Sequence, residues 1–226
     1  MQYLLDCANA ATVAEAMSYF PIVGVTTNPT FVSREKQEFL PLMDALHDVV
    51  GDKLFFVQTL SHTADGIVDE ALALQSHFGE PFYAKIPVSA EGLKAIRILR
   101  EKGCRTLGTA IFTPQQALLC ARAGASFVAP YVSRLDNIGG NGTEMVADMV
   151  DTLLNANVET EVLAAGLKTV QQVQGCALAG AGYATMTPDL MYQLAHHPLT
   201  DDAVRIFDEN WQAQYGAVTT LDLLRS

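Results

Sequence analysis

Short apolar segments and amphipathic segments alternate eight times along this chain of 226 residues. The apolar segments are rich in β-branched and aromatic residues, as strands are, and the segments between them carry apolar residues at helical spacing. The apolar segments are Gln2–Ala8, Ile22–Thr26, Lys53–Leu60, Phe82–Val88, Cys104–Ile111, Ser126–Val132, Glu161–Ala165 and Tyr183–Thr187. The helical segments are Thr12–Phe20, Glu35–Val50, Thr63–Phe78, Ser89–Lys102, Thr113–Ala123, Gly142–Asn155, Thr169–Ala179 and Pro188–Ala195. Strands that alternate with helices in this way pair in parallel.

Eight strand-helix units within 226 residues predict an α/β fold, a closed (β/α)8 TIM barrel near the small end of its size range. An open doubly wound sheet of eight strands is the alternative. Half of the residues are hydrophobic, and no linker or change of composition divides the chain. We therefore expect one domain over residues 1–226, with a glycine-rich loop at Gly139–Gly142 before the sixth helix.

Residues at the expected helix ends agree with this assignment. Thr12 and Glu15 have the spacing of a capping box, which would begin the first helix. Gly103, Gly124 and Gly180 each follow a helical segment, where a residue in the left-handed region commonly ends a helix.

The chain carries 25 Asp and Glu against 14 Lys and Arg, a formal net charge of −11. An acidic surface repels nucleic acid and anionic membranes, so we expect neither as a partner. An anionic substrate would then need local attraction from an arginine or a helix N-terminus. The first residues lack the layout of a signal peptide, and no apolar run is long enough to cross a membrane, so we expect a cytoplasmic protein.

Cysteine and histidine offer no site of their own. The four cysteines, at positions 7, 104, 120 and 176, are far apart and indicate reduced, buried thiols. Cys7 follows Asp6, whose carboxylate would raise the thiol pKa, so Cys7 is not expected to be a nucleophile. The five histidines form no HxH or HExxH pattern, so we expect no metal site.

Lys85 stands inside the apolar segment Phe82–Val88, close to its C-terminal end. Lysine is almost never fully buried without a partner or a function, and active sites in parallel α/β proteins form at this end of the strands. Burial against apolar side chains would lower the pKa of the amine, and a neutral amine can form a Schiff base with a ketone. The structural alternative is a lysine that extends from the strand end into solvent.

The other strand ends carry polar residues as well. In chain order the residues at the strand ends are Asp6, Thr26 with Asn28, Gln58, Lys85, Thr109, Tyr131, Gly166 and Thr187. In a barrel these ends meet at one mouth. A single threonine there is more often a turn residue, but an amine, a carboxylate, an amide and a phenol together indicate an active site.

Four segments carry a resemblance to a known family. Gly24–Thr30, GVTTNPT, resembles a GVTTNPS segment, and Lys85–Leu93, KIPVSAEGL, resembles a KxPVTAEGL segment. Leu107–Ala110 and Val128–Asp136 match as well. The chain thus resembles the small transaldolase and fructose-6-phosphate aldolase family, from residue 1 to about residue 215, and resembles the aldolase branch most.

The resemblance implies a class I aldolase barrel that needs no cofactor. It implies that Lys85 forms the Schiff base with the ketose and that Asp6 moves the hydroxyl proton during carbon–carbon cleavage. Thr26 and Asn28 would hold the dihydroxyacetone hydroxyls. Arg134 would bind the phosphate of the aldehyde half, for which a guanidinium is well suited. A surface ion pair with the nearby Asp136 is the structural alternative for Arg134.

Three positions distinguish the two branches of the family. The resemblance implies that Gln58, Thr109 and Tyr131 fix a catalytic water. In the transaldolase relatives these positions are typically glutamate, asparagine and phenylalanine, so this chain has the aldolase form at all three. A neutral amide and a phenol can orient a water that protonates the enamine, which would release dihydroxyacetone instead of transferring it.

One segment departs from the family pattern. Where relatives have AAS followed by Phe or Ile, this chain has Ala164-Ala165-Gly166-Leu167. Gly166 would lie at the substrate end of the site without the hydroxyl that serine would donate. Either the demand for phosphate is reduced, or the loop tolerates change.

A further helix is expected after the eighth unit, with Thr200 as its cap. Val204, Phe207, Trp211 and Tyr215 fall on one stripe of this helix. Because a barrel would already be complete, we expect residues 200–226 to dock on a neighbouring subunit. The resemblance implies a homo-oligomer, a decamer of two pentamers.

Three functions from different classes remain at this point. The first is a Schiff-base aldolase that cleaves fructose 6-phosphate to dihydroxyacetone and glyceraldehyde 3-phosphate and catalyses the reverse addition. The second is a transaldolase that transfers the dihydroxyacetone unit between sugar phosphates. The third is a barrel that only binds a sugar phosphate. In each case the expected partner is a small sugar phosphate, hydroxyketone or aldehyde.

Overall fold

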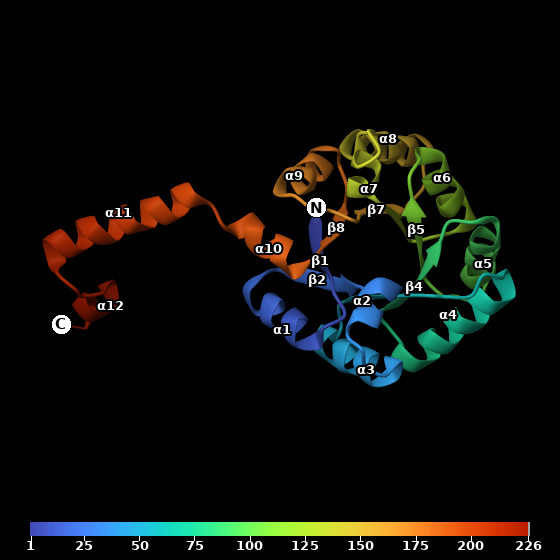
Figure 1. Cartoon of the computed structure of the whole chain (residues 1–226), viewed down its shortest axis with the longest axis horizontal. Helices are drawn as coiled ribbons and strands as arrows, with labels where there is room; N and C mark the ends of the chain where they lie inside the picture. The colour runs from blue at the N-terminus through green and yellow to red at the C-terminus, as the bar shows by residue number, and fades with distance from the viewer. Residues whose placement is uncertain (226) are drawn as a thin grey trace. The chain divides into compact units, whose positions relative to one another are not determined.

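The computed structural model describes residues 1–225 and contains a closed barrel of eight parallel strands (Figure 1). The strands are β1 (Gln2–Asp6), β2 (Ile22–Thr26), β3 (Leu54–Gln58), β4 (Phe82–Pro87), β5 (Thr106–Ile111), β6 (Phe127–Pro130), β7 (Glu161–Ala164) and β8 (Tyr183–Met186). They pair in sequence order, and β8 pairs with β1. The predicted (β/α)8 barrel is confirmed, and the open sheet is excluded.

A helix follows each strand, within a few residues of the predicted bounds. These helices are α1 (Ala10–Tyr19), α3 (Phe39–Val50), α4 (Ala64–Phe78), α5 (Ala90–Glu101), α6 (Pro114–Ala123), α8 (Gly142–Asn155), α9 (Val170–Leu178) and α10 (Pro188–Ala195). Helices α1, α3, α4, α5, α6, α8 and α9 surround the ring of strands in Figure 1. No helix within residues 1–225 has the length and hydropathy needed to cross a membrane.

Two short helices that the sequence did not predict follow β2 and β6. They are α2 (Pro29–Arg34) and α7 (Val132–Asp136), and α7 lies where a strand end and a loop were expected. Asn28 caps α2, because its side chain accepts from the amides of Thr30 and Phe31. Elements of five or six residues are too short to show a helical period, which explains why both were missed.

The helix caps correct one prediction and confirm another. Asn9 caps α1 by accepting from the amide of Thr12 at 3.0 Å, so the predicted capping box that begins at Thr12 is wrong. Gly103, Gly124 and Gly180 have φ angles of 73°, 105° and 87°, which confirms the left-handed residues expected after three helices.

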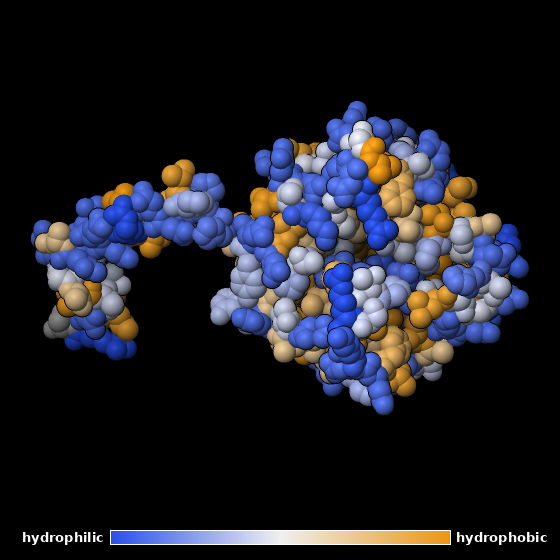
Figure 2. Space-filling view, in the orientation of Figure 1, coloured by the Kyte–Doolittle hydropathy of each residue, from blue (hydrophilic) through white to orange (hydrophobic). Residues whose placement is uncertain are grey.

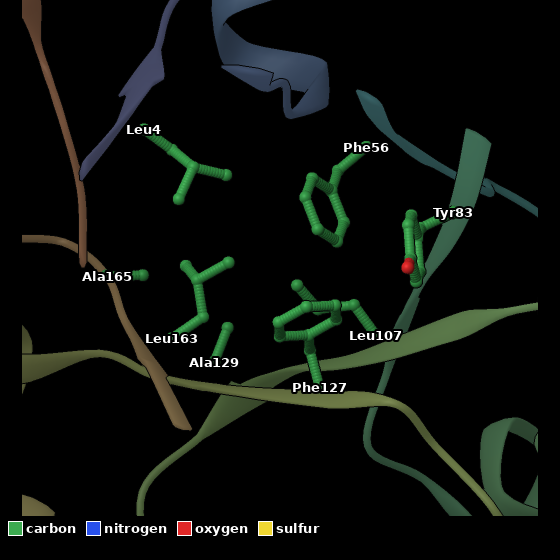
Figure 3. Packing of buried hydrophobic residues seen from close by; sticks show 8 residues of the cluster. All are labelled: Leu4, Phe56, Tyr83, Leu107, Phe127, Ala129, Leu163 and Ala165. Atoms are coloured by element: carbon green, nitrogen blue, oxygen red, sulfur yellow. The ribbon is translucent and has the colours of Figure 1, made fainter. Parts of the chain in front are cut away.

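The inside of the barrel is filled by a hydrophobic cluster (Figure 3). Its members are Leu4, Phe56, Tyr83, Leu107, Phe127, Ala129, Leu163 and Ala165. Phe56 stacks on Tyr83 with ring centroids 4.9 Å apart, and Phe127 meets the Phe56 ring edge-on at 5.4 Å. The barrel is therefore a packed core, and chemistry is restricted to one of its ends.

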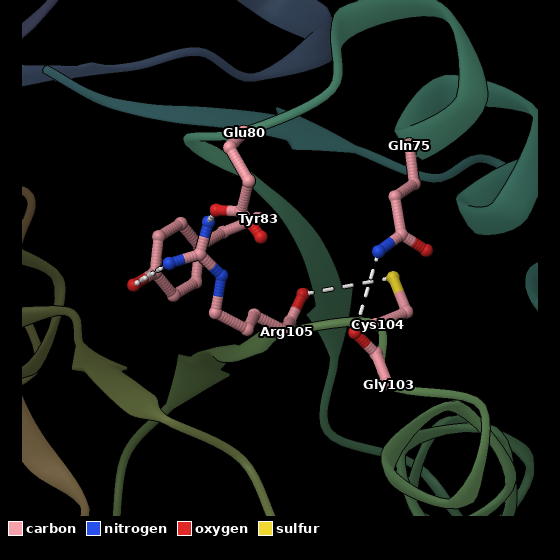
Figure 4. A network of polar contacts seen from close by, with 6 residues as sticks. All are labelled: Gln75, Glu80, Tyr83, Gly103, Cys104 and Arg105. Atoms are coloured by element: carbon pink, nitrogen blue, oxygen red, sulfur yellow. Dashed lines mark hydrogen bonds and ion pairs between the residues drawn. The ribbon is translucent and has the colours of Figure 1, made fainter. Parts of the chain in front are cut away.

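A polar network covers part of the cluster at the amino ends of β4 and β5 (Figure 4). The Arg105 guanidinium lies 4.3 Å above the centroid of the Tyr83 ring and donates to the Tyr83 hydroxyl at 3.1 Å. Glu80 pairs with the same guanidinium. Because Arg105 is held by an aromatic face and a carboxylate, this end has a structural role, and the carboxyl ends of the strands are the place to look for a site.

The chain divides into two compact units, Met1–Leu190 and the residues from Met191 onward. The second unit contains α11 (Pro198–Tyr215) and α12 (Thr220–Leu224). His197, and not the predicted Thr200, caps α11 by accepting from the Leu199 amide. The prediction of one domain over residues 1–226 stays a prediction.

Within the second unit the predicted apolar stripe is only partly used. The Trp211 and Tyr215 ring centroids lie 4.5 Å apart with the rings tilted by 37°, and the indole N–H of Trp211 donates to the Val218 carbonyl at 2.7 Å. Val204 and Phe207 remain 51% and 67% exposed, and Figure 2 shows hydrophobic side chains among hydrophilic ones on this unit. Docking on a neighbouring subunit stays a prediction.

Candidate active site

Strand periodicity places the candidate side chains directly above the hydrophobic cluster. Side chains two residues apart on a strand share a face. Leu4, Phe56, Tyr83 and Leu107 point into the barrel, so the residues two positions further along the same strands also point inward. Those residues are Asp6, Gln58, Lys85 and Thr109. The cluster closes the barrel beneath them, and these four side chains lie toward the carboxyl end.

Lys85 is only 3% exposed. Its Nζ donates to the Thr27 carbonyl oxygen at 3.0 Å, and no carboxylate of residues 1–225 forms an ion pair with it. This burial excludes the alternative of a lysine that extends into solvent. Gln58 is the register partner of Lys85 across β3 and β4, which puts the amide beside the amine.

Asp6 is the carboxylate of this site. Thr26 Oγ1 donates to its Oδ1 at 2.9 Å, and Asn28 Nδ2 does so at 3.5 Å. Burial raises the pKa of Asp6 above its ordinary value of 3.8, although the positive charge of Lys85 and the bond from Thr26 act to lower it. A carboxyl group with a raised pKa beside a lysine is typical of a group that exchanges protons.

Thr109 and Tyr131 form a second polar pair at the mouth. Thr109 Oγ1 donates to the Tyr131 hydroxyl at 3.2 Å. β5 is irregular here, because its register with β6 shifts between Gly108 and Ile111 and Ala110 has a φ of +57°. An alanine in the left-handed region costs about 1 kcal/mol, and such strain is found most often at functional sites.

Arg134 and Gly166 flank the same tyrosine. The Arg134 guanidinium lies 4.9 Å from the centroid of the Tyr131 ring, and Arg134 is the exposed residue of helix α7. Gly166 has a φ of +65°, and a Cβ built there would lie 3.7 Å from the Tyr131 Cα, an ordinary contact. Space would therefore admit a side chain, and the backbone conformation is what favours glycine.

The structure adds three residues that sequence reasoning missed. Thr185 Oγ1 lies 2.7 Å from Thr26 Oγ1, so Thr185, and not the predicted Thr187, is the threonine of β8 next to this cluster. Tyr183 packs against the hydrophobic cluster, and residues two positions apart on a strand face the same side, so this spacing could have identified Thr185. The Thr27 carbonyl holds Lys85. Lys168 is close enough for its charge to lower the pKa of Asp6, and no local pattern marked it.

The structure confirms buried thiols at Cys104, Cys120 and Cys176, whereas Cys7 is only half-buried. Burial raises the pKa of Cys104 to about 11 and the pKa of Cys120 and Cys176 to about 12. Burial also raises the pKa of Cys7, and the charge of Asp6 adds to that effect. These thiols are poor nucleophiles at neutral pH. Within residues 1–225, no group of three or more His, Cys, Asp or Glu side chains is arranged to hold a metal ion.

Comparison with known proteins extends this description. A family model described as transaldolase/fructose-6-phosphate aldolase matches residues 3–223. Among solved structures, one described as a lactate oxidase from Pediococcus acidilactici is similar, with a TM-score of 0.59 and 15% identity. The match covers 85% of this chain and 64% of that one, so this chain spans less than two thirds of the oxidase. At this identity the likeness concerns the barrel fold alone.

Proposed function

The chain belongs to the transaldolase/fructose-6-phosphate aldolase family, and we propose that within it this protein is a class I aldolase. It would cleave fructose 6-phosphate to dihydroxyacetone and glyceraldehyde 3-phosphate and catalyse the reverse addition. Membership brings enzymatic activity of transaldolase or aldolase type. The observation that carries the proposed Schiff-base chemistry is the buried Lys85 amine, which shares the barrel mouth with the Asp6 carboxyl group.

In the proposed reaction the Lys85 amine attacks the ketone carbon, a C–N bond forms, and water leaves to give an iminium. Asp6 takes the proton of the hydroxyl next to the bond that breaks. The electron pair of that carbon–carbon bond moves into the iminium, glyceraldehyde 3-phosphate leaves, and an enamine remains on Lys85. Protonation of the enamine carbon and hydrolysis of the iminium then release dihydroxyacetone and the free amine. Each proton that leaves the substrate has an acceptor within the site.

The aldolase branch is supported by the groups around Tyr131. The Tyr131 hydroxyl and Thr109 Oγ1 lie 3.2 Å apart, and Gln58 lies beside Lys85. Three neutral polar groups at one mouth are suited to hold a water that protonates the enamine. A fast protonation step releases dihydroxyacetone before an acceptor aldehyde arrives.

The phosphate is assigned to the cationic side of the mouth. Arg134 stacks on Tyr131, which restricts its motion, and Lys168 brings a second positive charge toward Asp6. In a chain with a net charge of −11, such a local concentration of cations is needed to attract an anionic sugar. Arg134 would bind the phosphate of the aldehyde half.

The test uses fructose 6-phosphate with and without erythrose 4-phosphate as acceptor. We expect free dihydroxyacetone in both cases, and borohydride treatment with substrate should attach one three-carbon unit at Lys85. Lys85→Met should abolish the adduct and the activity, whereas the matched control Lys94→Met removes an exposed lysine of α5 and should keep both. Product formation only when the acceptor is present would make the protein a transaldolase. Absence of the adduct would contradict Schiff-base chemistry altogether.

A further inference from the structure

One glutamine side chain connects two loops at the barrel mouth. Gln172 lies in the first turn of α9, and its Oε1 accepts from the amides of Lys168 at 2.7 Å and Thr169 at 3.3 Å. Its Nε2 donates to Asp136 Oδ2 at 2.6 Å. The other oxygen of Asp136 accepts from the Gly142 amide at 2.6 Å. Asp136 therefore does not form the ion pair with Arg134 that was the structural alternative in the sequence.

The connected loops carry the cationic side of the site. Asp136 ends α7, the helix that carries Arg134, and Gln172 lies in the first turn of the helix that follows the loop of Gly166 and Lys168. Backbone bonds also join the two loops near their strands, because the Ser133 amide donates to the Gly166 carbonyl at 3.2 Å. The hydrogen bond between Gln172 and Asp136 is a second connection between the two loops, made by side chains at the start of α9.

Helix capping accounts for only half of this arrangement. Thr169 and Gln172 form a capping box, in which the Gln172 oxygen serves the free amides at the start of α9. A glutamate would serve those amides equally well, but it has no N–H to offer. The donor of Gln172 goes to Asp136, in a different loop, and this bond is the part that the cap does not require.

We infer that Gln172 is a positioning residue for phosphate recognition: through Asp136 it holds the loop that carries Lys168 against the helix that carries Arg134. The inference rests on the proposed phosphate role of Arg134. Two cations bind one phosphate well only at a suitable separation, so the connection would select phosphorylated aldehydes over neutral ones. Asp136 and Gln172 would not touch the substrate themselves.

A reciprocal exchange tests the connection. Gln172→Glu keeps the cap but places a carboxylate against Asp136, so the two loops should separate. In the double variant Gln172→Glu with Asp136→Asn, the new asparagine side chain can donate to the new glutamate, so a hydrogen bond forms in the reverse direction. The double variant also has the same total charge as the wild type. Gln171→Glu is the charge control, because it adds the same charge at the neighbouring exposed position of α9.

Two readouts separate positioning from general stability. We expect Gln172→Glu to weaken the binding of inorganic phosphate, measured by NMR titration, by about fivefold, the size of one lost hydrogen bond. The ratio of KM for glyceraldehyde 3-phosphate to KM for glyceraldehyde should rise by a similar factor, with kcat for glyceraldehyde little changed. The double variant should return the phosphate affinity and the KM ratio toward the wild-type values, and Gln171→Glu should leave both unchanged.

Three results would overturn the inference. They are equal phosphate affinity in wild type and Gln172→Glu, an equal loss in Gln171→Glu, and failure of the double variant to recover while its thermal unfolding matches wild type. Phosphate binding needs no turnover, so it is independent of the aldolase proposal. If phosphate binding behaves as expected but Lys85→Met leaves activity intact, the proposed chemistry is wrong and the positioning role stands.

Discussion

Asp6 is a carboxyl group on which burial and charge act in opposite directions. Burial raises its pKa, and Lys85, the Thr26 hydroxyl and Lys168 act to lower it, with a net rise. A raised pKa makes the carboxylate a stronger proton acceptor than an ordinary aspartate, which suits the proton transfer of the proposed cleavage. The same burial makes the ionised form costly for the fold.

Asp6→Asn should therefore lower the activity and raise the stability. We expect kcat for cleavage to fall about a hundredfold or more, because the amide cannot accept the hydroxyl proton. From pH 3.8 up to the raised pKa, Asp6 in the folded protein keeps a proton that the unfolded chain releases, so the contribution of Asp6 to wild-type stability falls as pH rises. The variant should thus exceed wild type in free energy of unfolding by more at pH 7 than at pH 4.

Urea unfolding at pH 4 and pH 7 measures this difference in free energy of unfolding between the variant and wild type. The exposed Asp148→Asn, on α8, controls for the loss of one negative charge and should keep its activity. If the difference in free energy of unfolding between Asp6→Asn and wild type stays constant with pH, the raised pKa assigned to Asp6 is wrong.

The second prediction at residue scale concerns the proposed water. Gln58→Glu replaces the amide with a carboxylate, and Tyr131→Phe removes the phenol that contacts Thr109 at 3.2 Å. Either change should slow enamine protonation and leave the Lys85 adduct intact, so the ratio of transfer to cleavage should rise several-fold. The two effects need not add, because both residues act on one water. The assay compares transferred product with free dihydroxyacetone, and a wild-type ratio in the double variant would show that the water is held elsewhere.

At the scale of elements, the loop after β7 combines an unusual backbone conformation with a proposed part in phosphate recognition. Gly166 has a φ of +65° in this loop, and its carbonyl accepts from the Ser133 amide of α7. The sequence left two readings of this glycine open, reduced demand for phosphate or tolerance to change. The observed φ angle adds a third, a requirement of the backbone itself.

Gly166→Ser and Gly166→Ala distinguish the backbone from the hydroxyl. Both should lower the free energy of unfolding by about 1 kcal/mol, since both residues are strained at this φ. Only the serine should lower KM for glyceraldehyde 3-phosphate more than KM for glyceraldehyde. Urea unfolding and steady-state kinetics measure the two effects. Identical kinetics for the serine and alanine variants would remove any phosphate role from this position.

At the scale of the whole molecule, the second unit holds the surface proposed to contact another subunit. Val204 and Phe207 of α11 are more than half exposed, whereas Trp211 is engaged with Tyr215 and Val218. Apolar side chains exposed along a helix favour burial against a partner. The expected partner is a second copy of this chain, in a homo-oligomer.

Removing residues 200–226 should reduce the oligomer to smaller species, because large side chains lose their partner surface. Phe207→Glu is a milder test that keeps the whole chain, and Asp208→Ala on the same helix is its control. Light scattering gives the mass of each, and circular dichroism reports on the barrel, whose hydrophobic cluster lies within residues 1–190. An unchanged mass for both the truncated chain and Phe207→Glu would exclude this helix from the interface.

The barrel and the residues at its mouth were predictable from local pattern. Burial gives strands and helices their periods, and the parallel pairing of eight strands brings their carboxyl ends to one mouth. For this reason Asp6, Lys85 and Thr109 were identified one strand at a time, before any contact between them was known. The contact of Asp6 with Thr26 then follows from the register of the adjacent strands β1 and β2. The contact of Lys85 with Thr27 does not, because β3 lies between β4 and β2.

Other features were decided only by the tertiary structure. The position of Lys168 near Asp6, the choice of Thr185 over Thr187 and the bond between Gln172 and Asp136 join segments far apart in sequence. Short helices, φ angles and loop-to-loop bonds carry no periodic signal, because they depend on where neighbouring elements place a backbone in space. The sequence by itself thus determined the barrel and most of the residues at its mouth, and tertiary packing decided which of them touch.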